Sequence, residues 1–287
     1  MMRRQTQSGF TLAEMIMVIV ITGIIAGMVA VFITKPVQQY MDLARRAELT
    51  DTADTALRRI SRDVRLALPN SVRVTGTCNG TTGTCFLEFL PTGSSACATN
   101  SSCLGGGRYA VAPPGNPLVF DVADNEFTVL GPMPAIAAGD QIVVYNLGVA
   151  GADAYSGNTL ATDNRRTVTG TGAGTIQINS TARLPFESPG HRFHVINRPV
   201  TYVCAPSATG GTLRRYWGYP INATQPSAVP IANANSALVA NNVTLCRFDY
   251  SANVVAERSG LVTMQLGLTQ DSETVTLYVA VHVSNQP

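Results

Sequence analysis

The sequence predicts an α+β protein in which one long N-terminal helix packs on antiparallel β-strands of an exported, disulfide-bonded domain. Three observations support this fold class. An almost uncharged segment, Phe10–Ile33, lies near the start of the chain, and helical periodicity continues to Leu68. Beyond residue 69 the sequence changes to short β-prone runs separated by Gly, Pro, Asn and Ser. No alternation of strand and helix patterns follows, which argues against a parallel doubly wound sheet.

Composition narrows the possible functions. Of 287 residues, 13% are charged and 45% are hydrophobic, which excludes a disordered chain, because such chains carry much charge and few apolar residues. The formal net charge of +2 gives no broad basic surface, so nucleic acid is not an expected partner.

The segment Phe10–Ile33 predicts a single membrane span. A helix of this length extends over roughly 36 Å, enough to cross a bilayer with some tilt. Its one charged residue is Glu14. Arg3 and Arg4 precede the segment, so the positive-inside rule places the N-terminus in the cytoplasm and exports the rest. A twin-arginine or cleaved secretory signal fits less well, because the apolar run is too long and small residues precede it.

The sequence Gly-Phe-Thr-Leu-Ala-Glu-Met at 9–15 resembles the processing site of type IV prepilins and of type II secretion pseudopilins. The resemblance implies that a prepilin peptidase cleaves between Gly9 and Phe10 and methylates the new amino group of Phe10. It implies a pilin-like fold with four segments: a leader (1–9), a membrane and filament-core helix (10–34), an amphipathic helix (35–68) and a β-rich exported domain (69–287). Ala13 departs from the family, in which a larger aliphatic residue is commoner.

The resemblance to prepilins implies a specific role for Glu14 in subunit assembly. A carboxylate on a helix in lipid is costly and normally has a partner. In the pilin family this glutamate pairs with the positive N-terminal amine of a neighbouring subunit during assembly. The alternative is a carboxylate that reaches the headgroup region without a partner.

The apolar segment also carries small residues at a spacing that lets membrane helices approach closely. Gly23 and Gly27 are four residues apart, and Ala26 and Ala30 repeat that spacing. Gly23 and Gly27 therefore predict a face on which the helix packs against other helices.

The helical pattern continues beyond the membrane with one apolar face. Its members step by three or four residues: Ala53, Leu57, Ile60, Val64 and Ala67. The opposite face interleaves arginines with acids: Arg45, Arg46, Arg58, Arg59, Arg62 and Arg65 with Asp42, Glu48, Asp51, Asp54 and Asp63. Solvated ion pairs are expected there in preference to a site for DNA or acidic lipid. Pro36 is expected to kink or loosen the helix, and Pro69 to end it.

The C-terminal sequence predicts an antiparallel hairpin. Residues 262–268 and 275–283 alternate apolar and polar positions, and a turn at Gln270–Glu273 separates them. The other expected strands are Phe86–Leu90, Leu118–Val122, Gln141–Asn146, Thr175–Ile178, Arg192–Ile196, Thr201–Cys204, Leu213–Trp217 and Thr244–Tyr250.

The six cysteines all follow the membrane segment, which is typical of disulfides in an oxidising compartment. They are Cys78, Cys85, Cys97, Cys103, Cys204 and Cys246. Six cysteines allow about 15 pairings. Proximity in the sequence favours pairing of 78 with 85, 97 with 103, and 204 with 246. Zinc is not expected, because no CxxC cluster occurs in the sequence.

Few residues suggest catalysis, and neither an enzyme activity nor a cofactor is expected. His191 and His194 are three apart in a predicted strand, so they should point to opposite faces. His282 falls on the polar face of the last strand. No HExxH, GxSxG or Walker motif occurs, and Gly170–Gly174 predicts a turn.

Two further groups have a structural and a functional interpretation. Asp121, Asp124 and Glu126 could contribute to a calcium site, but they lack EF-hand spacing and are expected to be loop residues. The segment 214–219, Arg-Arg-Tyr-Trp-Gly-Tyr, could anchor a partner, but is expected to form core beside a basic turn.

A second resemblance concerns the exported domain. The segments 36–74, 144–148 and 198–204 are similar to the MshO family of biogenesis proteins of mannose-sensitive-haemagglutinin (MSHA) type IV pili. This implies a minor pilin of a Gram-negative bacterium, held in the inner membrane with a periplasmic domain and then moved into a pilus that serves adhesion. The implied partners are prepilin peptidase, other pilins, the inner-membrane assembly platform and membrane lipid. The alternatives are a type II secretion minor pseudopilin, an unprocessed single-span receptor or adhesin, and a tethered periplasmic hydrolase.

Overall fold

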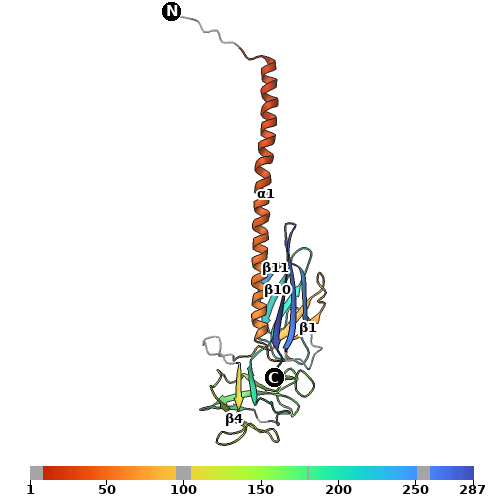
Figure 1. The fold of residues 1–287 in the computed structure, drawn as a ribbon. Coiled ribbons are helices and arrows are strands. Elements are labelled where there is room, and N and C mark those ends of the chain that lie inside the picture. Colours follow the sequence, from red (N-terminus) through yellow and green to blue (C-terminus); the bar gives the residue numbers. More distant parts are fainter. Residues whose placement is uncertain (1–8, 95–104, 180, 251–258) are drawn as a thin grey trace, which may run out of the picture. The chain divides into compact units, whose positions relative to one another are not determined.

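The computed structural model describes residues 9–94, 105–179, 181–250 and 259–287. These residues form one helix, α1 (Leu12–Arg65), and thirteen strands (Figure 1). The strands are β1 (Arg73–Gly76), β2 (Cys85–Phe89), β3 (Gly106–Tyr109), β4 (Glu126–Leu130), β5 (Gln141–Val144), β6 (Arg165–Thr171), β7 (Thr175–Ile178), β8 (Arg192–Ile196), β9 (Val200–Ala205), β10 (Gly211–Trp217), β11 (Asn235–Tyr250), β12 (Ser259–Gln270) and β13 (Glu273–Ser284). The chain divides into two compact units, Met1–Glu48 and Leu49–Pro287.

The first unit contains the apolar part of α1. Within the described residues, α1 is the one helix long and apolar enough to cross a membrane. Its apolar side chains are exposed, as a lipid-facing or partner-facing helix requires. The loosening predicted at Pro36 does not interrupt the helix, which remains continuous through this residue. One lost backbone hydrogen bond is tolerated because many turns on either side keep theirs.

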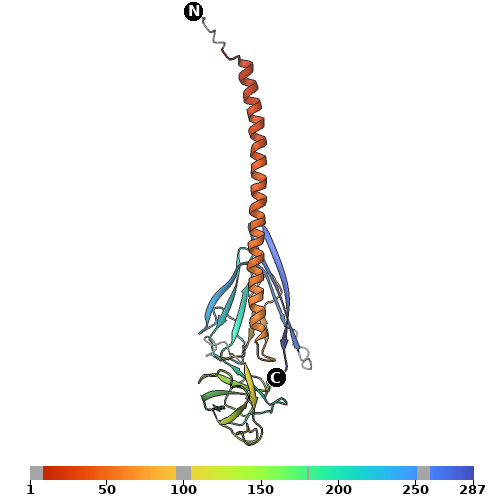
Figure 2. The ribbon, with the colours of Figure 1, turned by 60° about the vertical axis from the view of Figure 1, so that its left-hand side comes forward.

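In the second unit, the last turns of α1 pack on a seven-stranded antiparallel sheet in the order β1-β2-β9-β10-β11-β12-β13 (Figure 2). The predicted apolar face is confirmed, since all five of its members are buried. The helix ends at Arg65, before the predicted Leu68. The reason is that the Leu68 N–H donates to the carbonyl of Leu90, at 2.7 Å, and so leaves the helical pattern.

The interface between helix and sheet gives a first testable prediction. Leu57 is 1% exposed, whereas Leu66, just beyond the helix, is 55% exposed. Leu57→Ala is expected to lower the free energy of unfolding by about 3 kcal/mol, because it leaves a cavity, and Leu66→Ala by less than about 1 kcal/mol. Denaturant unfolding of the full chain in detergent measures both losses. Equal losses would contradict the packing of Leu57 between helix and sheet.

Asp63 does not lie on the solvated face as predicted. Its Oδ2 accepts hydrogen bonds from the Arg215 Nε at 2.9 Å and from the Tyr202 hydroxyl at 2.8 Å. The prediction was wrong because a helix-only pattern cannot show that strands β9 and β10 bring a cation and a hydroxyl to this position. Arg58 and Asp54 do form the ion pair expected between successive turns of the helix.

The predicted C-terminal hairpin is confirmed as β12 and β13, whose closing residues Gln270 and Glu273 are register partners. All the other predicted strands except one have counterparts. The exception is Leu118–Val122, which is loop. Leu118 is buried in a core, and the Val119 N–H donates to Asp124 Oδ2 at 2.8 Å. The Asp124 carboxylate therefore accepts the backbone hydrogen bond that a neighbouring strand would accept if this segment were in a sheet.

The structure also contains a closed six-stranded barrel that the sequence did not predict. Its strand order is β3-β4-β7-β6-β5-β8. All six strands lie in the connection between β2 and β9, which are neighbours in the large sheet. The barrel has a core of its own, with Phe127 and Phe193 in edge-to-face contact at 5.3 Å between ring centroids. The predicted turn at Gly170–Gly174 joins β6, which extends to Thr171, to β7.

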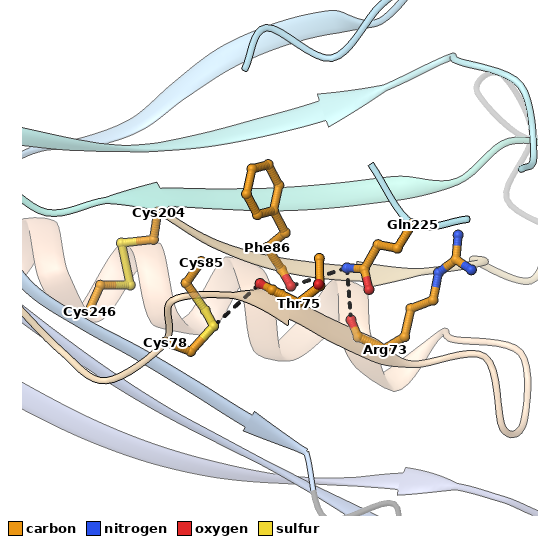
Figure 3. Close-up of a disulfide and its surroundings, with 8 residues drawn as sticks. All are labelled: Arg73, Thr75, Cys78, Cys85, Phe86, Cys204, Gln225 and Cys246. Atoms are coloured by element: carbon orange, nitrogen blue, oxygen red, sulfur yellow. Dashed lines mark hydrogen bonds between the residues drawn. A yellow bond between two sulfur atoms is a disulfide. The ribbon is translucent and has the colours of Figure 1, made fainter. Parts of the chain in front are cut away.

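Two disulfides tie the large sheet together (Figure 3). Cys78 pairs with Cys85, and Cys204 of β9 pairs with Cys246 of β11, which are two of the three pairings favoured by the sequence. The third, between residues 97 and 103, lies outside the described residues. Cys85 and Cys204 are also register partners across β2 and β9, so the two disulfides are neighbours.

Candidate processing and assembly site

The N-terminus of α1 is closed by a reciprocal cap between Thr11 and Glu14. The Thr11 N–H and hydroxyl donate to Glu14 Oε2 at 2.9 and 3.0 Å. In return, the Glu14 N–H donates to the Thr11 hydroxyl oxygen at 3.3 Å. This is a capping box, in which the residue before the helix and the third helical residue satisfy each other's free N–H groups. The box fixes where the helix begins.

The cap leaves half of the Glu14 carboxylate unused. The two hydrogen bonds that Thr11 donates to this carboxylate both end on Oε2. Within the described residues, Oε1 accepts no hydrogen bond. A carboxylate has lone pairs on each oxygen, so Oε1 retains its full capacity for a further donor. Glu14 can therefore hold its own helix end and bind a cation at the same time.

The bond between Gly9 and Phe10 lies immediately outside this cap. Both residues are exposed, and Phe10 is 84% exposed. A Cβ placed on Gly9 would meet no heavy atom within 4 Å, so the fold itself does not require glycine there. A non-helical, exposed peptide bond next to a rigid helix is accessible to a peptidase.

Gly23 and Gly27 lie on the exposed surface of α1. A Cβ at either position would likewise meet nothing within 4 Å. Glycine inside a helix destabilises it by roughly 0.5–1 kcal/mol relative to alanine. Since no contact with the described residues uses their small size, these glycines leave a shallow surface suited to another helix.

These features can be compared with known proteins. Residues 4–30 match the family model of the prokaryotic N-terminal methylation motif. The N-terminus is type IV pilin-like. The match spans the basic residue Arg4, the bond after Gly9, the capped helix start and most of the apolar segment. Such a motif implies processing by prepilin peptidase and assembly with other pilins. Comparison with curated proteins and with solved structures found no match.

Sequence reasoning missed the capping role of Thr11. The signal was present, because Thr-Leu-Ala-Glu at 11–14 has the spacing of a capping box before an apolar run. The resemblance to prepilins assigned Glu14 only a role toward another subunit. The structure adds that the same side chain also serves its own helix.

The histidines do not come together. His191 has a positive φ of 53° and precedes β8, so the prediction that it shares a strand with His194 was wrong. The backbone turns there because the His191 N–H donates to the Ser188 carbonyl at 2.8 Å. His282 is exposed on β13. Among the described residues no three of His, Cys, Asp and Glu are grouped so that they could hold a metal.

Of the three acids considered for calcium, Asp121 and Asp124 lie in a loop as predicted, whereas Glu126 begins β4. Both oxygens of Asp124 accept backbone N–H groups, from Val119 and Glu126.

In the aromatic segment, Tyr216 and Tyr219 are buried in a small core, as predicted, but Arg214 and Arg215 lie in strand β10 and not in the predicted turn. Trp217 is partly buried, with the Arg215 guanidinium 5.2 Å from its ring centroid.

Proposed function

We propose that this chain is a minor pilin, cleaved by prepilin peptidase between Gly9 and Phe10 and methylated at Phe10. The observation that carries the proposal is the methylation motif at residues 4–30, placed on an exposed apolar helix. An apolar helix with this motif is suited to two environments in succession. It anchors the subunit in the inner membrane first, and then packs in the core of a filament.

Assembly is non-covalent in this proposal. Removal of the leader creates a positive amine at Phe10, four residues before Glu14 in the same chain. Glu14 Oε1 accepts this amine from a neighbouring subunit while Oε2 keeps the cap with Thr11. Opposite charges attract more strongly in lipid or in a dry helical core than in water, so the pair directs docking there. Gly23 and Gly27 then allow neighbouring helices to come close.

We further propose that the filament is an MSHA-type type IV pilus, in which the chain acts in assembly initiation or at the tip. The similarity of residues 36–74, 144–148 and 198–204 to MshO supports this assignment. Two of these segments lie where the barrel meets the rest of the unit. Asn146 is fully buried and its Nδ2 donates to the Pro69 carbonyl at 2.7 Å, and residues 198–204 run from the connection after β8 into strand β9 itself. The exported domain acts in adhesion without enzymatic chemistry.

The test is whether the chain co-purifies with surface filaments. Filaments are sheared from cells, separated from membranes and analysed by immunoblotting and mass spectrometry. The proposal expects the mature chain among the minor components of the pilus. A Gly9→Val variant is the control, because a β-branched side chain at the cleavage site should block processing and keep the chain in the membrane.

A gene deletion separates the nearest alternative, a minor pseudopilin of a type II secretion system. Deletion of the gene is expected to reduce pilus number and leave protein secretion unchanged. Loss of secretion with normal pili would replace the pilus assignment with the pseudopilin. A chain that is retained in membranes with its leader intact would favour an unprocessed receptor.

A further inference from the structure

A pocket of about 420 Å³ opens beside the outer surface of the barrel. Strands β3 and β8 form one wall, and the rest comes from residues after α1, from Thr92 and Gly105, and from the end of the chain. Its size lies within the range of small-molecule sites. None of its lining residues in the described part of the chain is acidic, although three basic side chains line it: Arg108, Arg192 and His194.

The two arginines face each other directly across the strands. Arg108 and Arg192 are register partners in the antiparallel β3–β8 pair, and both are exposed. Side chains at such positions stand about 5 Å apart at Cβ, and like charges there are destabilising. The Arg108 Nε donates to the Gly190 carbonyl at 3.2 Å, which orients its guanidinium and leaves its terminal nitrogens to other acceptors.

No carboxylate of the described residues is in direct contact with either arginine. Neither Arg108 nor Arg192 forms an ion pair among these residues. Glu187, the acid closest in sequence to Arg192, lies 3.2 Å from His191 Nδ1 instead. Two arginines held together without a counter-charge are arranged for an anion that comes from outside the chain.

His194 supplies a polar wall beside the arginines. It lies two residues after Arg192 in β8 and therefore on the same face. Its Nε2 is buried and has no hydrogen-bond partner among the described residues. Burial, and to a lesser extent Arg192, lowers the pKa of His194 to about 4, so the imidazole is neutral at pH 7. Opposite it stands Gly106, where a Cβ would clash with the Phe193 carbonyl oxygen, so glycine lets β3 and β8 approach closely beside His194.

We propose that this pocket binds the oxyanion of a small ligand, a carboxylate or a phosphate, between Arg108 and Arg192. Each guanidinium presents paired N–H groups that fit two oxygens of such an anion. The bound charge removes the repulsion between the arginines. His194, together with Gln286, which also lines the pocket, offers hydrogen bonds to neutral groups of the same ligand, as hydroxyl groups of an acidic sugar would require. The site does not depend on filament assembly.

The test uses the full chain in a neutral detergent that has no sugar headgroup, in a buffer free of phosphate. Glucuronate, inorganic phosphate and glucose are titrated separately by calorimetry. Glucuronate is expected to bind, and glucose is not. Arg108→Gln and Arg192→Gln are each expected to weaken glucuronate binding at least tenfold. Arg247→Gln is the matched control, because Arg247 is also an exposed strand arginine but lies on β11.

Folding is monitored in the same samples. Without ligand, Arg108→Gln and Arg192→Gln should melt no lower than the parent chain, since each removes one of two opposed like charges. Binding of phosphate alone, with the same dependence on both arginines, would support the oxyanion site and assign it to free or esterified phosphate. The proposal is overturned if neither anion binds at millimolar concentration, or if Arg247→Gln weakens binding as much as the pocket variants.

Discussion

Glu14→Ala is expected to reduce incorporation of the chain into filaments at least tenfold while leaving cleavage after Gly9 largely intact. The variant removes the Oε1 acceptor proposed for the amine of a neighbouring subunit. It leaves the Gly9–Phe10 bond exposed, and it makes the segment more apolar, so membrane insertion is retained. The mature chain is quantified in membranes and in sheared filaments by immunoblotting. Normal incorporation of this variant would refute the pairing role.

Two control variants separate pairing from capping. Thr11→Val deletes the hydroxyl that serves the cap but keeps the carboxylate of Glu14 and the backbone N–H of residue 11. Incorporation of this variant should stay close to normal. Glu48→Ala removes an exposed glutamate from the same helix and should have no effect. A loss with Thr11→Val as large as that with Glu14→Ala would show that the helix start, and not an intermolecular charge pair, limits assembly.

Removing the disulfide between Cys204 and Cys246 is expected to have the largest effect on stability. The two residues are 42 apart in sequence. In the chain-entropy model, closing a loop of this length stabilises the fold by roughly 4 kcal/mol. The double variant Cys204→Ala with Cys246→Ala is the clean test. A single variant would leave a thiol next to the other disulfide, because Cys204 lies opposite Cys85.

The second disulfide provides the comparison. Cys78 and Cys85 are 7 apart in sequence, for which the same model gives roughly 2 kcal/mol. Denaturant unfolding of both double variants, in the full chain under non-reducing conditions, measures the two losses. A greater loss for the short loop than for the long one would contradict the account of how these disulfides stabilise the large sheet.

The sequence predicted the elements whose residues repeat regularly. Leu57 and Ile60 follow the helical period and are buried on the sheet, and residues 262–283 alternate as β12 and β13 do. In both cases one face of the element packs on one continuous core, so the apolar residues repeat in the sequence at the spacing of the buried positions. The candidate site, apart from the capping role of Thr11, was found because its residues are contiguous. The cap, the cleavage bond and the glycines all lie within residues 9–27, where sequence order gives spatial order.

The barrel could not be predicted in this way. Its strands are short, and β3 reads Gly-Gly-Arg-Tyr, which carries no period. Arg166 shows the same limit, since an arginine is normally exposed. Here it is 1% exposed and donates to carbonyls of Asp163, Ala182 and Arg183, which hold the loops around β6 in place. The pairing of Arg108 with Arg192 likewise depends on register between distant segments.

The central claim is that the chain is processed as a prepilin, and the mass of its N-terminus tests this most directly. The chain is expressed with an active prepilin peptidase and isolated from membranes, and its N-terminal peptide is sequenced by mass spectrometry. The account predicts a chain that begins at N-methylated Phe10. A chain that keeps Met1–Gly9, while a control prepilin in the same cells is cleaved, would contradict it.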